Sequence, residues 1–505
     1  MSQETNSAPV TENKMGTMPI GRLVFNMSLP MMISMLVQAL YNIVDSIFVA
    51  KLSENALTAV SLAFPLQTLI IAVATGTGVG VNALLSKSLG AHKYDEANKI
   101  GINGAVLYAF SYVIFLILGL TIVKPFYMSQ IGNADIEIMD MGVSYLSTVM
   151  IFSFGIFAEI FFERVLTSTG RTIFSMTSQL CGAITNIILD PIMIFGLLGF
   201  PKLGATGAAV ATVVGQCVAA VVAFACNHKF NHEISLSFKG YSPDFKIMGT
   251  IYAIGIPSII MQSIGSIMTY AMNRILIGFS STAAAVFGVY FKLQSFFFMP
   301  VFGLNNGITP IIAFNYGAQN RKRMVKTIKV SLITAFCLLF VALPALSFIH
   351  HVLLGMFSAS DDMLQIGVPA LRIIGVHFLI AWFCIIVGTV FQALGKAVFS
   401  MIVSIMRQLV VLIPAAYILS RLGGLHAVWW AFPIAEVISF TVSTLFLIRI
   451  NRTIISKILM EAMCCKKFVT IQNSYRDLII CTGAFMCPFF NPVIYMGLLK
   501  NTILL

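Results

Sequence analysis

Charged side chains are scarce in this sequence. They make up 10% of its 505 residues, and hydrophobic residues make up 58%. Soluble proteins contain roughly 25% charged and 45–50% apolar residues, so the composition excludes an ordinary soluble enzyme. A net charge of +12 would indicate nucleic-acid binding in a soluble protein, but here the basic residues collect in short loops between apolar stretches. Acidic residues number only 19, so each carboxylate inside an apolar stretch needs an explanation.

The absence of several sequence patterns excludes further classes of protein. The nine cysteines show no disulfide or zinc spacing and are interpreted as packing residues, although Cys464 and Cys465 beside two lysines leave lipidation open. No signal-peptide cleavage site, metalloprotease pattern or nucleophile elbow occurs, and no cofactor is expected. The segment 76–80, Gly-Thr-Gly-Val-Gly, imitates a dinucleotide fingerprint but lies in an apolar run with no preceding strand. Small residues there indicate close contact between helices.

Long apolar runs account for most of the chain. A membrane-spanning helix needs roughly 20 apolar residues. Twelve runs reach this length, near residues 24–50, 56–83, 103–123, 143–163, 172–198, 204–227, 248–275, 283–313, 330–349, 366–394, 398–420 and 426–449. The sequence therefore predicts an all-α polytopic membrane protein with twelve spans.

The apolar sequence is duplicated. Phe64-Pro65-Leu66-Gln67 reappears 227 residues later as Phe291-Lys292-Leu293-Gln294. In the same register Pro30, Gly76, Gly80 and Gly90 return as Pro257, Gly303, Gly307 and Gly317. A duplicated bundle of membrane helices is typical of secondary transporters, whose substrate path lies between the halves. Each half has six spans, an even number, so both halves enter the membrane from the same side. An axis along the membrane normal should therefore relate two pseudo-symmetric six-helix lobes around a central cavity.

The repeat predicts the domain boundaries. We expect a cytoplasmic N-terminal tail, an amino-terminal lobe, a cytoplasmic linker, a carboxy-terminal lobe and a C-terminal tail, at residues 1–22, 23–228, 229–246, 247–450 and 451–505. The last tail contains an uncharged stretch, 478–499, that is long enough to span but is interrupted by two prolines. Most Lys and Arg lie in the tails or after even-numbered spans, as in Arg321-Lys322-Arg323. The positive-inside rule then predicts a cell-membrane protein with both ends of its core in the cytoplasm.

Several ionisable side chains lie at membrane depth, where each costs about 2.5–3.5 kcal/mol or more and indicates function. The first half has Asp45 in span one, Glu159 and Glu163 in span four, and Asp190 in span five. Asn186 lies four residues before Asp190, so both side chains share one helix face and can hold one cation or proton. Pro30 and Pro191 should allow the helices to bend.

Structural roles for these acids remain open alternatives. Asp190 could cap a helix or pair with a buried basic group such as Arg164. Asp45 could be a helix-end carboxylate next to Lys51 at the outer interface, and Glu163 could pair with Arg164 or Arg171. The second half is different, because its acid at membrane depth is Glu436, which we predict to pair with Arg407. Coupling chemistry is therefore predicted in the first half.

At these residues the chain resembles the multidrug and toxic compound extrusion (MATE) family. The resemblance covers roughly residues 20–450 and rests on the paired halves and on several short segments. These are Ser28-Leu29-Pro30, Tyr41-Asn42 with Asp45 and Ala50, Gly90-Ala91, Asn186 to Pro191, and Gly207-Ala208-Ala209-Val210-Ala211-Thr212. It implies a V-shaped pair of lobes that alternates access and exports cationic amphipathic compounds against protons or sodium.

The resemblance also implies a set of site residues. It is closer to the DinF-like branch, whose cation-coupling positions match Asp45, Asn186, Asp190 and Thr212 and whose cavity positions match Gln38 and Tyr41. Glu163 is predicted to line the same cavity. The acids that the NorM-like branch carries in spans seven and ten are absent. No metal site is certain, although Asp45, Asn186, Asp190 and Thr212 offer oxygen ligands that suit sodium.

We therefore expect a monomeric antiporter, not an enzyme, whose partners are small-molecule drugs, protons or sodium, and membrane lipids. Protons are favoured over sodium, because two carboxylates facing one dry cavity repel each other and can share a proton. The main alternative is a flippase for lipids or lipid-linked oligosaccharides, which would need a cavity lined with Arg and Lys. A membrane-embedded transferase or hydrolase would need a catalytic cluster, for which His350-His351 is the only candidate.

Overall fold

The computed structural model describes residues 13–131, 136–237, 242–348 and 361–458. Its ordered elements in these ranges are helices, and no strand occurs among them, which confirms the predicted all-α class. Residues up to Ser456 form one compact unit. Asp135, His350, His351, Cys464, Cys465 and the segment 478–499 lie outside the described residues.

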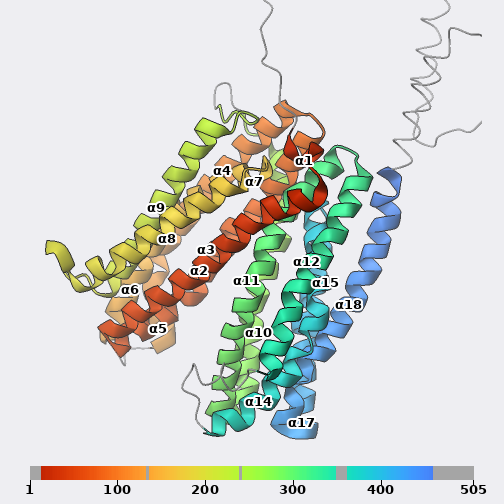
Figure 1. The fold of residues 1–505 in the computed structure, drawn as a ribbon. Coiled ribbons are helices and arrows are strands. Elements are labelled where there is room, and N and C mark those ends of the chain that lie inside the picture. The colour runs from red at the N-terminus through yellow and green to blue at the C-terminus, as the bar shows by residue number, and fades with distance from the viewer. Residues whose placement is uncertain (1–12, 132–135, 238–241, 349–360, 459–505) are drawn as a thin grey trace, which may run out of the picture. The chain divides into compact units, whose positions relative to one another are not determined.

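The first half of the chain forms the helices of the amino-terminal lobe (Figure 1). Their bounds are α2 Ile20–Leu52, α3 Glu54–Gly90, α4 Tyr94–Thr121, α5 Val123–Ile131, α6 Ile136–Ile151, α7 Phe154–Ser168, α8 Thr172–Phe195 and α9 Ala205–Phe230, with a short 3-10 turn, η1, at Leu197–Gly199. α2 and α8 run as single helices through Pro30 and Pro191.

The second half repeats this order in the carboxy-terminal lobe. Its helices are α10 Phe245–Ile277, α11 Ser281–Gly317, α12 Arg321–Phe348, α14 Asp361–Gly375, α15 Phe378–Ala393, α16 Ala397–Ile405, α17 Ile413–Val428 and α18 Ala431–Ile450. A π-helical segment, η2 at Met406–Leu412, joins α16 to α17, and a second one, η3 at Asn451–Ile455, follows α18.

The helix count agrees with the predicted twelve spans. Ten helices of the described residues are long and apolar enough to cross a membrane, and two bent pairs bring the number to twelve if each pair is one span. The pairs are α6 with α7, bent by 41°, and α14 with α15, bent by 51°. Each pair is the fourth span of its lobe, so the break itself is part of the duplication.

The repeated glycines lie at close backbone contacts between the two lobes. A Cβ added to Gly80 of α3 would lie 2.3 Å from the carbonyl oxygen of Ile251 in α10. A Cβ on the matching Gly307 of α11 would lie 2.6 Å from the Cα of Ser28 in α2. Real Cβ atoms do not approach so closely, so these backbones can meet only because the side chains are missing. The fingerprint-like glycines are therefore packing residues, as predicted.

Gly90 and Gly317 make the same contact at one end of the lobe interface. A Cβ on either residue would lie 1.9 Å from a carbonyl oxygen of the other lobe, that of Phe314 or that of Lys87. In Figure 1 the helices of the two lobes converge toward this end, near the label α1, and separate toward α5 and α14. Backbone contacts thus hold one end of the interface closed.

A short helix, α1 (Lys14–Thr17), lies at this closed end and bonds to both lobes. Arg323 at the start of α12 donates from Nη2 to the carbonyl oxygens of Met15 (3.0 Å) and Met18 (2.7 Å). On the other side, the Asn13 amide donates to the carbonyl oxygen of Thr169 at 3.2 Å, in the turn between α7 and α8. The Met15 side chain is fully buried. Part of the segment predicted as a tail therefore joins the lobes.

Glu233 in the linker completes this contact. It accepts from the Asn13 amide at 2.7 Å and lies 3.9 Å from the Arg171 guanidinium. Burial raises the pKa of the Glu233 carboxyl above its usual value, although Asn13, Arg171 and Lys14 each oppose the change. Burial, with the nearby Arg171 charge, lowers the pKa of Lys14. Both groups are thus partly desolvated at the closed end.

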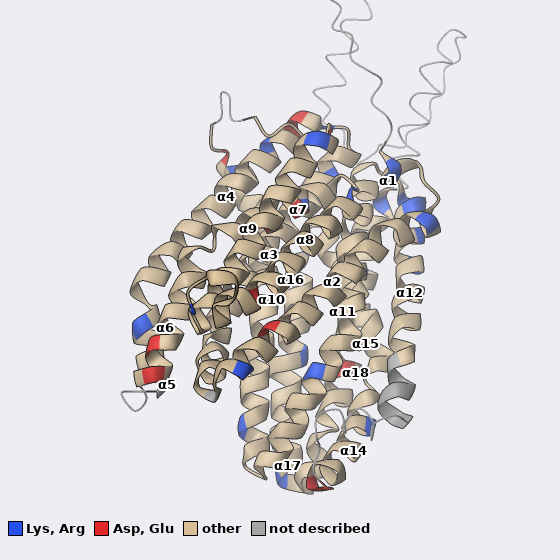
Figure 2. Ribbon diagram, turned by 60° about the vertical axis from the view of Figure 1, so that its left-hand side comes forward, with Lys and Arg blue, Asp and Glu red and all other residues tan. Residues whose placement is uncertain are grey.

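Charged residues lie mainly at the ends of the helices. Figure 2 shows several Lys and Arg together near α1 and the start of α12, and long tan stretches along the bundle. The few charges in these stretches are the candidates for function, as the composition predicts.

Candidate functional site

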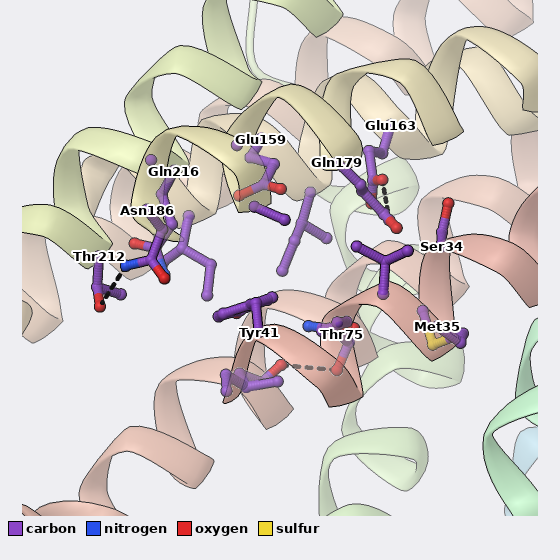
Figure 3. A pocket seen from close by; sticks show the side chains of 18 of the residues that line it. Ser34, Met35, Tyr41, Thr75, Glu159, Glu163, Gln179, Asn186, Thr212 and Gln216 are labelled. Atoms are coloured by element: carbon purple, nitrogen blue, oxygen red, sulfur yellow. Dashed lines mark hydrogen bonds between the residues drawn. The ribbon is translucent and has the colours of Figure 1, made fainter. Parts of the chain in front are cut away.

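A cavity of about 110 Å³ opens in the amino-terminal lobe, among α2, α3, α7, α8 and α9 (Figure 3). Gln38 and Tyr41 of α2, Glu163 of α7, and Asn186 and Thr212 of α8 and α9 are all on its wall. Sequence reasoning selected each of them for the site. Asp45 and Asp190, the two proposed coupling acids, are not among its lining residues.

Asn186 connects Asp190 to Thr212. Its amide nitrogen donates to Asp190 Oδ1 at 3.3 Å and to Thr212 Oγ1 at 3.4 Å. With the amide turned over, Asn186 still bonds to both residues, through Asp190 Oδ2 and the Thr212 backbone N–H. Asp190 has no exposed surface and Asn186 is 3% exposed. With the half-buried Thr212, they form one polar group that can hold a proton or a small cation.

Two glycines make the contact between α8 and α9 possible. A Cβ on Gly182 would lie 2.9 Å from the carbonyl oxygen of Gly215, and one on Gly215 would lie 2.8 Å from that of Gly182. The helices approach through bare backbone at this level, as small residues allow in membranes. This approach lets Thr212, one turn from Gly215, reach the amide of Asn186.

Asp45 of α2 faces the same region. Its Oδ1 is buried and has no hydrogen-bond partner among the described residues. It lies close enough to Asp190 for the two negative charges to repel each other. A buried carboxylate oxygen without a partner is costly, so the position favours binding of a proton or a cation.

Glu163 and Glu159 of α7 are both on the cavity wall. Glu163 is 4% exposed and accepts from Ser175 Oγ at 3.1 Å and from the Gln179 amide. Glu159, one helical turn away, lies in Figure 3 between the Asn186 group and Glu163. The two carboxylates are close enough to repel each other. Neither belongs to an ion pair among the described residues, whose three pairs lie elsewhere.

The basic residues expected to pair with these acids make other contacts. Arg164, the expected counter-ion, donates instead to Asn306 Oδ1 of α11 at 3.0 Å and so links the two lobes. Lys51 does not pair with Asp45 but lies over the Phe48 ring, 6.0 Å from its centroid. The ion pairs proposed for Asp190, Asp45 and Glu163 are therefore absent from the part of the chain that the structure describes.

The carboxy-terminal lobe has a second cavity, of about 220 Å³. Arg407 in η2 and Glu436 in α18 lie on its wall, and Arg407 Nη1 is 3.4 Å from Glu436 Oε2. The predicted ion pair is confirmed. A positive and a negative charge neutralise each other there, whereas the first cavity has two carboxylates and one guanidinium on its wall.

Sequence reasoning missed part of the site. It noted Glu159 but did not select it for the cavity, and it did not notice Gln179, Thr75 or Gln216, which are also on the wall. Glu159 lies four residues before Glu163, and this spacing could have placed both side chains on one helix face. The polar residues of α8 and α9 gave no comparable signal.

Comparison with known proteins agrees with the duplicated fold. The family model described as MatE matches the chain twice, over residues 30–192 and 257–418. The two matches begin at Pro30 and Pro257, the prolines that the sequence repeat pairs. This chain belongs to the MatE family. The matched segments contain most of α8, with Asn186 and Asp190, and all of η2 with Arg407.

Relatives of this MatE protein extend the match over most of its length. The multidrug export protein MepA of Staphylococcus aureus (strain MSSA476) is 27% identical over 424 residues, which cover 83% of this chain and 91% of MepA. MepA of Staphylococcus haemolyticus (strain JCSC1435) is 28% identical over 425 residues, with the same coverage. A solved structure described as the outward-facing conformation of a multidrug resistance MATE family transporter superposes with a TM-score of 0.82 at 26% identity, covering 89% of this chain and 99% of that one.

Proposed function

We propose that this chain is a multidrug exporter that moves cationic amphipathic compounds out of the cell in exchange for protons. The observation that carries the proposal is the pair of carboxylates, Glu159 and Glu163, on the wall of the amino-terminal cavity, outside the ion pairs of the described residues. The same wall has one guanidinium, that of Arg164, so two carboxylates leave it a net negative charge, which attracts organic cations. The MepA relatives, named as multidrug export proteins, support the same class of substrate.

The coupling step is assigned to Asp45 and Asp190 with Asn186 and Thr212. A proton entering from the outer side neutralises the Asp45–Asp190 pair and relieves the repulsion between them. Asp190 then holds Asn186 less strongly, and α2 can change its bend near Pro30, which releases the substrate. Sodium is the alternative ion, with the same four residues as oxygen ligands. No group of three or more His, Cys, Asp or Glu residues suited to a metal occurs among the described residues.

The membrane potential drives this exchange when one more proton enters than the number of positive charges that leave, because one proton exchanged for one monovalent cation moves no net charge. One elementary charge that moves through about 150 mV releases about 3.5 kcal/mol. Because 1.4 kcal/mol is a factor of ten, this energy sustains a substrate gradient of a few hundredfold. Such a gradient is sufficient to keep a toxic compound at low concentration inside the cell.

The flippase alternative is less consistent with the cavities. A diphosphate headgroup needs several Arg or Lys side chains. The amino-terminal cavity has Arg164 as the basic residue of its described lining, and the second cavity has Arg407 paired with Glu436. Neither wall offers the positive charge that such a ligand requires.

Vesicles with imposed ion gradients test the function. Purified protein in liposomes loaded with a fluorescent organic cation should expel the dye when a pH gradient alone is imposed in sodium-free buffer. Activity should fall when the outside is made alkaline. Transport that needs sodium and ignores the pH gradient would reassign the four residues as sodium ligands. Absence of dye movement under either gradient would refute the exporter proposal.

The direction of export also depends on orientation, which we propose from the basic loops: Asn13 and Arg321 in the cytoplasm, Asp135 and Asp361 outside. Single cysteines at these positions, in a variant that lacks the native cysteines, can be labelled in intact cells. An impermeant maleimide should label residues 135 and 361 only. Labelling at 321 from outside would reverse the orientation.

A further inference from the structure

The carboxy-terminal cavity differs from the amino-terminal one in size and in lining. It lies among α10, α11, α15, η2 and α18, and its volume of about 220 Å³ is twice that of the amino-terminal cavity. Its wall combines aromatic and polar side chains: Met268, Phe291, Gln294, Phe298, Phe302 and Phe432 beside Arg407, Gln408 and Glu436. These rings suit a molecule that carries one aromatic group.

The Arg407–Glu436 pair leaves one carboxylate oxygen unused. Glu436 is 3% exposed, and its Oε2 bonds to Arg407 Nη1. Its Oε1 is buried and has no hydrogen-bond partner among the described residues. An acceptor of this kind costs free energy unless a donor fills the position. The Cys384 thiol beside Glu436 is a weak donor, so a stronger donor can come from a ligand in the cavity that Glu436 lines.

Arg407 offers the complementary group. A guanidinium carries five N–H donors, and Arg407 uses one nitrogen for Glu436. Its side chain is 30% exposed, so the remaining donors are accessible. Arg407 belongs to the π-helical segment Met406–Leu412, and such segments are rare in helices and frequent at functional sites. Near this segment the second half repeats the first at a spacing of 225 residues, which pairs Gly170 with Gly395. At this spacing Arg407 corresponds to Gly182, which is on the wall of the first cavity.

The charge balance of this wall selects the ligand. A simple cation that approaches Glu436 meets the positive charge of Arg407, and a simple anion that approaches Arg407 meets Glu436. A molecule with both charges satisfies the free oxygen and the free N–H groups together. Because Arg407 and Glu436 are only 3.4 Å apart, the two charges of the ligand must also be close to each other.

We propose that the carboxy-terminal cavity binds aromatic zwitterions of the α-amino-acid type, with the ligand ammonium on Glu436, its carboxylate on Arg407 and its ring among Phe291, Phe298 and Phe432. Aromatic rings stabilise one another by edge or offset contacts of about 0.5–1.5 kcal/mol beyond their buried area. The binding claim stands apart from the proposed export of cations, which rests on the other lobe.

Three compounds with the same ring and different charges, none larger than tryptophan, test the proposal: L-tryptophan, tryptamine and indole-3-propionate. They are zwitterionic, cationic and anionic, respectively, and each carries the same ring. Their dissociation constants for the purified protein in detergent are measured by saturation-transfer NMR. L-tryptophan should bind the wild type at least about tenfold more tightly than either derivative, a difference of about 1.4 kcal/mol.

Substitutions locate the binding site. Glu436→Gln and Arg407→Gln should each remove the preference for the zwitterion, and so should the double variant, which leaves no unpaired charge. The double variant also guards against misfolding, because replacing a buried ion pair by neutral residues is often tolerated. Glu159→Gln, in the other lobe, is the matched control and should leave tryptophan binding unchanged.

The outcomes separate the two proposals. Equal binding of the three compounds to the wild type, or tryptophan binding that survives in the folded double variant, would overturn the zwitterion site and leave Arg407–Glu436 as a purely structural pair. Neither result would change the expected export of dye, which depends on the amino-terminal lobe. If instead dye export fails in the wild type while tryptophan binds through Glu436, the proposed function is wrong and the zwitterion site remains.

Discussion

The two lobes have the same framework but different charges. In both, the fourth span is broken, and glycines of the second span contact the other lobe through bare backbone. The amino-terminal cavity, however, has Glu159 and Glu163 without an ion pair among the described residues, whereas the acid of the carboxy-terminal cavity, Glu436, is neutralised by Arg407. The comparison shows that small residues and helix breaks preserve the duplicated fold, and that a few polar residues give each lobe its own chemistry.

The largest expected effect is on transport. Asp190→Asn and Asp45→Asn keep the shape of each side chain and remove its charge, so gradient-driven dye export should fall by about 100-fold or more, as for loss of a charge-assisted interaction of about 3 kcal/mol. The measurement is efflux from vesicles at equal protein content. Asp140→Asn, an exposed carboxylate on α6, is the matched control. Wild-type export in either test variant would remove the proposed distinction between the lobes.

The ion pair provides the second test, on stability. Glu436→Gln or Arg407→Gln leaves one charge without its partner, and should lower the free energy of unfolding by about 3 kcal/mol. The double variant should recover most of the loss. Glu159→Gln should cost little, because Glu159 loses no ion pair. Thermal unfolding in detergent measures all four variants. If the double variant is no more stable than the single variants, Arg407 and Glu436 do not stabilise the fold as a pair.

The repeated glycines should be equivalent in the two lobes. Gly90→Ala and Gly317→Ala each place a Cβ 1.9 Å from a carbonyl oxygen of the other lobe, and should cost about 1–3 kcal/mol as overpacked sites do. Gly249→Ala in α10 meets nothing within 4 Å and should be neutral or stabilising by up to about 1 kcal/mol, because alanine favours helix. The change in melting temperature reports each effect. A harmless Gly90→Ala would contradict the close contact between the lobes.

The smallest predicted effect concerns pH at the closed end. The folded-state pKa of Glu233 is raised above its ordinary value of 4.5, because burial disfavours its charge. Its contribution to stability is therefore complete below about pH 4.5 and is lost as the pH rises through the raised folded-state pKa. Glu233→Gln should flatten this part of the melting temperature profile while keeping an acceptor for Asn13. A profile unchanged by the substitution would assign the pH dependence to other groups.

Much of the fold could be predicted because its signals repeat. Gly80 and Gly307 occupy equivalent positions in two apolar runs, so the sequence itself indicated two like halves that pack closely. Arg407 could be paired with Glu436 because the second half has no other acid at membrane depth. Asn186 and Thr212 are different: they are on separate helices, and only the family resemblance connected them before the structure did.

The rest depended on contacts that no local pattern encodes. Glu159 and Glu163 share one helix face, and only packing against α8 decides that Ser175 and Gln179 bond to Glu163. Arg164 could equally have paired with an acid of its own lobe, but it reaches Asn306 across the interface. Residues 13–17 are too few to show a helical period, so their place between the lobes had no sequence signal.

That place between the lobes has a consequence for biosynthesis. The carbonyl oxygen of Met15 accepts from Asn315, which follows it by 300 residues. At about 5–20 residues per second, the ribosome needs roughly 15–60 s to make the intervening chain. During this interval eight spans leave the ribosome, and Met15 cannot yet bond to Asn315. The closed end of the protein is thus assembled late, when α11 and α12 reach the N-terminal residues 13–18. A block in insertion of α11 or α12 would leave residues 13–18 accessible to proteases.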